Sequence, residues 1–151
     1  MKPRYLLFVP FVILALVGVV IADDGADDDP AEPQRPGITR VGPGTDIREI
    51  ASDPFQLDSA VVEGNVLKIT VTYAGGREEH AFALYWSGIS TRSRPPQLPM
   101  VLKHDANGDM AEALITRTIE FDLGALNRHA IINIRTDHGD SARVEYGERL
   151  R

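Results

Sequence analysis

Hydrophobic and polar residues alternate along most of the chain after residue 54. In the clearest run, 67–73, leucine, isoleucine, valine and tyrosine take the odd positions, and lysine and threonine take the even ones. A period of two is typical of a β-strand with one buried face. Comparable runs occupy 55–62, 80–86, 100–104, 111–123, 130–136 and 142–150.

Turn sequences separate these runs and no long helical periodicity accompanies them. Glu63-Gly64-Asn65 and Asp137-His138-Gly139-Asp140 are typical of tight turns. Thr45 is placed to cap a short helix over 46–52, before Pro54. About seven short strands in roughly 100 residues predict an all-β fold, an immunoglobulin-like β-sandwich, with a small barrel as the alternative.

The first 44 residues differ from the rest. Lys2 and Arg4 precede an apolar stretch over 5–22, which predicts an export signal peptide cleaved after Ala22 or an uncleaved membrane anchor. Residues 23–44 are acidic and rich in proline and glycine, as in a flexible linker. We therefore expect a signal or anchor at 1–22, a linker at 23–44 and a domain at 45–151. The protein is expected to be exported to the periplasm or exterior, with membrane contact only through 5–22 if these residues are retained.

Composition excludes several classes of protein. A net charge of −6 argues against nucleic acid as a partner, because phosphate binding needs clustered cations. The absence of cysteine excludes disulfides, thiolate zinc sites, cysteine nucleophiles and lipid attachment to cysteine.

The best chemical constellation combines His80 with His104, Asp105 and Asp109. Both histidines share the parity of apolar residues in their strands, so antiparallel pairing would bring them together at the rim of the core. Two imidazoles and one or two carboxylates are sufficient to hold zinc or a similar divalent ion. The alternatives are rim histidines that hydrogen-bond to backbone or carboxylate, and a catalytic His-Asp pair for which spacing supplies no nucleophile.

The acidic stretch 105–109 has a second interpretation. Its oxygen-bearing residues resemble the first half of a calcium loop, but Met110 stands where the glycine of that loop belongs. A turn led by Asn107-Gly108 explains the same residues without a metal.

Segments 73–86 and 95–123 resemble a group of uncharacterised exported bacterial proteins and, more distantly, the β-sandwich domain of NigD-like proteins. The group's pattern reads Tyr-x-Gly-Gly-Cys-x-x-His-x-Phe, followed by His-Asp-x-x-x-Asp-x-Cys-Glu-Ala. Matching positions in this chain are Gly75, Gly76, His80, Phe82, His104, Asp105 and Glu112. Arg77 and Met110, or a near neighbour, replace the cysteines. The resemblance implies an exported β-sandwich with no assigned activity, in which a disulfide between these loops is dispensable.

These observations predict an exported binding or structural module. Its partner would be a protein or another envelope component, and no catalytic residues or cofactor are predicted. The alternative is a divalent-metal-binding module that uses His80 and His104.

Overall fold

The computed structural model of the chain describes residues 35–42, 44–126 and 129–147. The expected signal or anchor at 1–22 lies outside the described residues, as does most of the expected linker. Within the described part of the chain, no helix has the length and hydrophobicity needed to cross a membrane.

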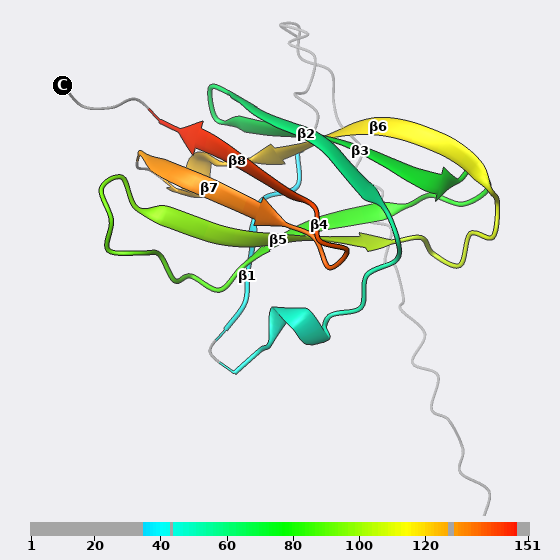
Figure 1. Ribbon diagram of the computed structural model, residues 1–151, viewed down its shortest axis with the longest axis horizontal. Coiled ribbons are helices and arrows are strands. Elements are labelled where there is room, and N and C mark those ends of the chain that lie inside the picture. Colours follow the sequence, from blue (N-terminus) through cyan, green and yellow to red (C-terminus); the bar gives the residue numbers. More distant parts are fainter. Residues whose placement is uncertain (1–34, 43, 127–128, 148–151) are drawn as a thin grey trace, which may run out of the picture. The chain divides into compact units, whose positions relative to one another are not determined.

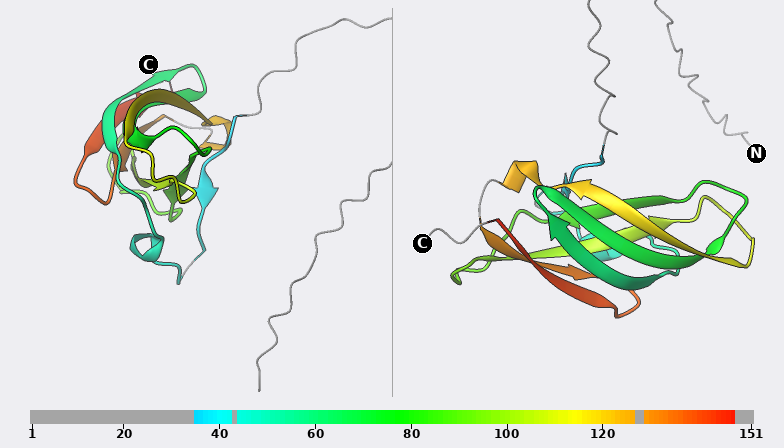
Figure 2. Two further views of the ribbon diagram at one scale, coloured as in Figure 1. Left: turned by 90° about the vertical axis from the view of Figure 1, so that its right-hand side faces the viewer. Right: turned by 90° about the horizontal axis from the view of Figure 1, so that it is seen from above.

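Two β-sheets face each other around one core, as Figures 1 and 2 show. The larger sheet has the strand order β1-β4-β5-β7-β8 and the smaller has the order β2-β3-β6. The larger sheet comprises β1 (Thr39–Arg40), β4 (Ala81–Trp86), β5 (Gln97–Asp105), β7 (Ala130–Arg135) and β8 (Ser141–Tyr146). The smaller comprises β2 (Gln56–Glu63), β3 (Val66–Gly75) and β6 (Ala113–Asp122). The predicted all-β sandwich is therefore confirmed.

The alternation in the sequence decides which side chains form the core. In β3 the odd residues from 67 to 73 are buried, while the even residues face outward. This strand lies between β2 and β6, with Leu67 opposite Phe121 and Ile69 opposite Ile119. From the larger sheet, β5 and β7 contribute buried residues at alternate positions. Burial of these apolar faces is the main stabilising contribution to the fold.

Local details refine the predictions. The short helix is a single 3-10 turn (η1, Ile47–Glu49), and its cap is Asp46 rather than Thr45, because the Asp46 carboxylate accepts the N–H of Arg48. Asn107 and Gly108 both have positive φ, as the predicted Asn-Gly turn requires. A second 3-10 turn (η2, Gly124–Leu126) follows β6.

The segment before η1 joins the sandwich. Strand β1 pairs in parallel with Tyr85 and Trp86 of β4. Upstream of it, Gly37 bridges to Asp122 of β6, so this segment contacts both sheets. Residues 35–41, within the stretch expected to be a linker, thus connect the edges of β4 and β6.

Candidate functional site

Two histidines meet where β4 and β5 pair. The antiparallel register places Phe82 opposite His104, and His80 lies just before β4 on the same side. His80 Nδ1 is 2.8 Å from His104 Nε2. Both side chains are buried, and His104 is only 2% exposed. The proximity expected from strand parity is therefore present.

Asp109 holds the other end of this pair. Its Oδ2 accepts backbone N–H groups from Gly76, Arg77 and Glu78 at 2.7, 2.8 and 3.0 Å. The same oxygen is 3.2 Å from His80 Nε2, and the carboxylate is fully shielded from solvent. Backbone hydrogen bonds, with a smaller contribution from His80, hold the pKa of Asp109 well below its usual range. Asp109 is therefore an anion that orients His80.

The ionised carboxylate fixes where the protons lie. His80 Nε2 donates to Asp109, so a neutral His80 accepts at Nδ1 from the Nε2–H of His104. When each imidazole carries one proton, Nδ1 of His104 is an acceptor, and this buried atom makes no hydrogen bond with any residue that the structure describes. Burial, and then the neighbouring His80, lower the pKa of His104. The backbone groups of Asp53 and Pro54 and the Asp53 carboxylate oppose that shift.

Aromatic rings enclose the two imidazoles. The Phe82 ring stacks on His104 with centroids 4.4 Å apart, and Tyr73 lies 4.5 Å from His80. Gly75 is required on the remaining side, because a Cβ there would lie 2.5 Å from His80 Nε2. The rings therefore have little freedom to move.

The predicted metal ligands are only partly brought together. His80, His104 and Asp109 form one hydrogen-bonded chain, whereas Asp105 is exposed and accepts the backbone N–H of Asn107. Two nitrogens on one tetrahedral zinc, each at about 2.0–2.1 Å, would be roughly 3.3 Å apart, so metal binding would require the rings to separate. Among the described residues, no group of three or more potential ligands is arranged to hold a metal. Metal binding stays a prediction.

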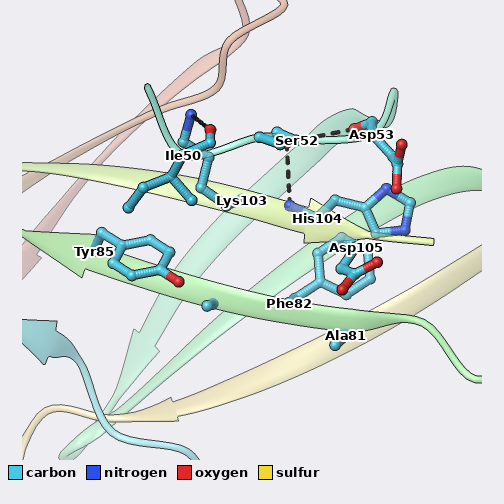
Figure 3. A pocket seen from close by; sticks show the side chains of 11 residues that line it. Ile50, Ser52, Asp53, Ala81, Phe82, Tyr85, Lys103, His104 and Asp105 are labelled. Carbon is cyan, nitrogen blue, oxygen red and sulfur yellow. Dashed lines mark hydrogen bonds between the residues drawn. The ribbon is translucent and has the colours of Figure 1, made fainter. Parts of the chain in front are cut away.

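A pocket of about 430 Å³ lies beside this chain (Figure 3). Residues 50–53 form one wall, and β4 and β5 form the rest. His104, Asp53 and Asp105 lie at one end, with Ile50 and Tyr85 toward the other. The side chains that line the pocket include two aromatic rings, two carboxylates and one hydroxyl: Phe82, Tyr85, Asp53, Asp105 and Ser52.

Lys103 is a residue of this pocket that the sequence does not reveal. It is 3% exposed, and its ammonium donates to the carbonyl of Ile50 at 2.7 Å and to the carboxylate of Asp137. A lysine on an alternating strand is expected to face water, and these acceptors are far away in sequence. The same holds for Ser52 and Asp53, which pair with the backbone of His104. No local pattern marks them.

Comparisons with known proteins indicate the fold. No family model and no curated protein matches the chain. Among solved structures, a protein described as toxin-related from Parabacteroides distasonis is 17% identical with a TM-score of 0.55, over 75% of this chain and 60% of that one. A DUF1344 protein of unknown function from Bacteroides vulgatus is 11% identical with a TM-score of 0.52, over 76% and 57%. A NigD-like immunity protein from Bacteroides caccae is 18% identical with a TM-score of 0.48, over 73% and 59%.

The chain thus spans about 60% of the length of these structures, and the similarity shows a shared β fold. A NigD-like protein is among the distant structural neighbours. The cysteine-containing pattern stays a prediction.

Proposed function

We propose that this protein is an exported β-sandwich binding module, acting in the cell envelope or outside the cell, whose ligand site is the pocket beside His104. The convergence of aromatic rings and polar acceptors on one pocket of about 430 Å³ carries this proposal. Binding sites in proteins commonly combine an apolar lining with a few placed polar groups.

The scaffold under the pocket supports a binding role. His104 is held by His80, which is in turn held by Asp109, and the backbone N–H groups around Asp109 fix the carboxylate. A binding group held on strands and supported by further hydrogen bonds is pre-organised for its ligand.

The serine in the pocket is arranged for structure rather than nucleophilic attack. Ser52 Oγ accepts the backbone N–H of His104 at 3.1 Å and donates to the carbonyl of Asp53 at 3.4 Å. A serine nucleophile needs its hydroxyl hydrogen-bonded to a base, so this contact pattern favours binding over acyl transfer.

Cell fractionation tests export. We expect the expressed protein outside the cytoplasm, with a mature N-terminus at Asp23 if the signal is cleaved. Retention of the full-length chain in the membrane fraction would favour the anchor instead. A full-length cytoplasmic protein would contradict export.

Affinity capture from envelope extracts tests the binding site. We expect a partner retained by the wild-type protein and lost with Tyr85→Ala or Asp105→Asn. The matched control is Asp58→Asn, which removes a carboxylate that bonds Thr72 on the smaller sheet. Equal capture by the pocket variants would show that another surface binds the partner.

A divalent metal at His80 and His104 is the second candidate, favoured by the convergence of two imidazoles and Asp109. An ion at about 100 times its dissociation constant should raise the unfolding temperature by roughly 4–8 °C. Zinc and calcium should be tested after EDTA treatment. A shift lost in His80→Gln and His104→Gln would support the site, and no shift would exclude it.

A further inference from the structure

We propose that the free edge of β6 binds an extended strand of another polypeptide, which sets an acidic side chain against Arg117. The surface differs from the pocket beside His104, which lies between residues 50–53, β4 and β5. The inference therefore goes beyond the proposed function. The added strand would extend the smaller sheet, which has three strands where the larger sheet has five.

The first argument is that one border of the smaller sheet is open. On the other border, β2 packs against β8, and the N–H of Leu57 donates to Asp140. Figure 2 shows β6 as the border strand on the open side. Within the described part of the chain, the backbone on this edge of β6 is paired only at Asp122, which bridges to Gly37. An unpaired edge is a template for a further strand.

The hydrogen bonds at the end of β6 show which groups face this edge. The N–H of Asp122 donates to the carbonyl of Pro36 on the open side, and the N–H of Leu123 donates to the carbonyl of Asn65 beside β3. These directions alternate along a strand, and the register of β6 with β3 has no shift. The N–H and C=O groups of Thr116 and Thr118 therefore point to the open edge.

A groove of about 640 Å³ lies beside this edge, between β6 and β4. Ile115, Arg117 and Ile119 lie on the face of β6 that turns toward the larger sheet, because they pair with inward residues of β3. The two isoleucines are nevertheless only half-buried and Arg117 is exposed. Phe82 of β4, which also lines the groove, is half-buried. The inward side chains of an added strand would cover these apolar groups.

Arg117 determines the charge of the strand that fits. In the described part of the chain its guanidinium has no ion-pair partner, since Glu120 pairs with Arg35 and the other carboxylates of the groove, Glu79 and Asp105, lie on its β4 side. In an antiparallel strand, the residue opposite Arg117 would belong to a non-hydrogen-bonded pair, in which side chains are closest. Opposite charges in such a pair stabilise the sheet, so aspartate or glutamate fits there.

Two other occupants fit this edge less well. In a second copy of the chain, the inward residues of β6 are again isoleucine, arginine and isoleucine, and none of them supplies a carboxylate. The chain's own residues 30–36 contain Pro30, Pro33 and Pro36, which have no N–H to donate to a neighbouring strand. A strand with apolar residues on either side of an acidic one satisfies both the groove and Arg117.

A synthetic peptide tests the proposal. The peptide Thr-Val-Thr-Glu-Thr-Val-Thr reads the same in both directions, so it serves for either strand orientation. Amide hydrogen exchange of the whole protein would be followed by NMR as the peptide is added. We expect saturable protection of the N–H groups of Thr116 and Thr118, and no change at Arg117, whose N–H faces β3. N-methylation of the internal threonines of the peptide should abolish binding, because it removes the donors that face β6.

A charge reversal tests the role of Arg117. Replacing the glutamate of the peptide with lysine should weaken binding to the wild type about fivefold. In Arg117→Glu the preference should reverse, with the lysine peptide bound about fivefold more tightly. The matched control is Arg143→Glu, which reverses an exposed arginine of β8 in the larger sheet and should leave the preference unchanged.

Each of four results would overturn the proposal. The first is unchanged exchange at Thr116 and Thr118 with the peptide, and the second is equal binding of the glutamate and lysine peptides. Protection that rises with protein concentration without peptide would assign the edge to a second copy. Protection without peptide that is independent of concentration would assign it to the chain itself.

Discussion

Asp109 holds the site together through hydrogen bonds to the backbone and to His80. It accepts four backbone N–H groups, three at Oδ2 and that of Ala111 at Oδ1, and it faces His80. Asp109→Asn keeps one acceptor oxygen and Asp109→Ala keeps none. We expect the unfolding midpoint in urea to fall in the order wild type, Asn, Ala, because the backbone N–H groups lose their hydrogen-bond acceptor.

Asp105→Asn is the control for this series, since the Asp105 side chain is exposed and, within the part of the chain that the structure describes, accepts only the N–H of Asn107. It should lower the midpoint less than either Asp109 variant. A smaller effect at Asp109 than at Asp105 would contradict the role assigned to Asp109.

The pH dependence of stability reports on His104. Its pKa in the folded protein lies below the ordinary value of 6.5, because burial and His80 disfavour the charged form. The unfolded state therefore binds the proton more tightly. The stability is complete above about pH 6.5 and falls as the pH decreases through the folded-state pKa, by up to about 1.4 kcal/mol for each pH unit.

Urea unfolding at pH 7.5 and pH 5.5 should show this loss in the wild type, and His104→Gln should reduce it. His138→Gln is the matched control, since His138 is exposed. Equal pH dependence in wild type and His104→Gln would assign the titration to another group. Asp109, whose pKa is lowered from 3.8, contributes in a separate window below about pH 4.

At the scale of single residues, the sequence predicts the pair but not what supports it. Strand parity predicts that His80 and His104 share a face, and the register confirms that they meet. The acceptor role of Asp109 depends on the backbone N–H groups of a loop over 30 residues away. The direction in which a backbone N–H points cannot be predicted from the residue types of the loop. Burial of Lys103 likewise requires a carbonyl and a carboxylate that only the folded chain brings near.

At the scale of elements, Gly75 at the end of β3 links the strand to the site. A Cβ there would lie 2.5 Å from His80 Nε2 and 3.2 Å from Asp109 Oδ2. We expect Gly75→Ala to displace the imidazole and break its contact with Asp109. Imidazole ¹⁵N spectra should then lose the hydrogen-bonded signature of His80 Nε2. Gly37→Ala, where a Cβ meets nothing within 4 Å, is the control and should leave the spectra unchanged.

The central strand β3 should be far more sensitive to substitution than the edge strand β2. Ile69 is fully buried between two neighbouring strands, while Val61 on β2 is 50% exposed. Ile69→Ala should lower the free energy of unfolding by about 2–5 kcal/mol, because it leaves a cavity. Val61→Ala should change it by less than about 1 kcal/mol. Comparable losses in urea titrations would contradict the assigned order of strands.

Strands with long alternating runs were predictable, and the shortest was not. Each of β2 to β8 corresponds to a run that the sequence reveals. Strand β1 has two residues, both exposed, and its pairing with β4 is a tertiary contact that local pattern does not encode. The helix predicted over 46–52 is only one 3-10 turn long. It begins after its cap, Asp46, and it ends at Ile50, whose backbone is extended.

At the scale of the whole domain, the two sheets are joined on both sides. On one side, the N–H of Leu57 in β2 donates to Asp140, just before β8, at 3.1 Å, and the hydroxyl of Tyr146 in β8 donates to Asn65, in the turn between β2 and β3, at 3.0 Å. On the other side, the segment that leads into β1 contacts the smaller sheet, where Arg35 pairs with Glu120 of β6 at 2.7 Å. The buried residues form one continuous core between the sheets. Neither sheet can lose its packing partner without exposing its own apolar face.

This arrangement predicts that the two sheets unfold together, and the chain contains its own reporter. Its single tryptophan, Trp86, lies in the larger sheet and donates to the carbonyl of Ile89, whereas Ile69 lies in the smaller sheet. Ile69→Ala should shift the fluorescence transition of Trp86 and the far-ultraviolet circular dichroism transition to the same lower urea concentration, since a cooperative domain has one transition. Val61→Ala should leave both transitions close to those of the wild type. If Ile69→Ala moved the dichroism transition and left the fluorescence transition in place, the sheets would be separate cooperative units, and the shared core would not couple the pocket on β4 and β5 to the rest of the fold.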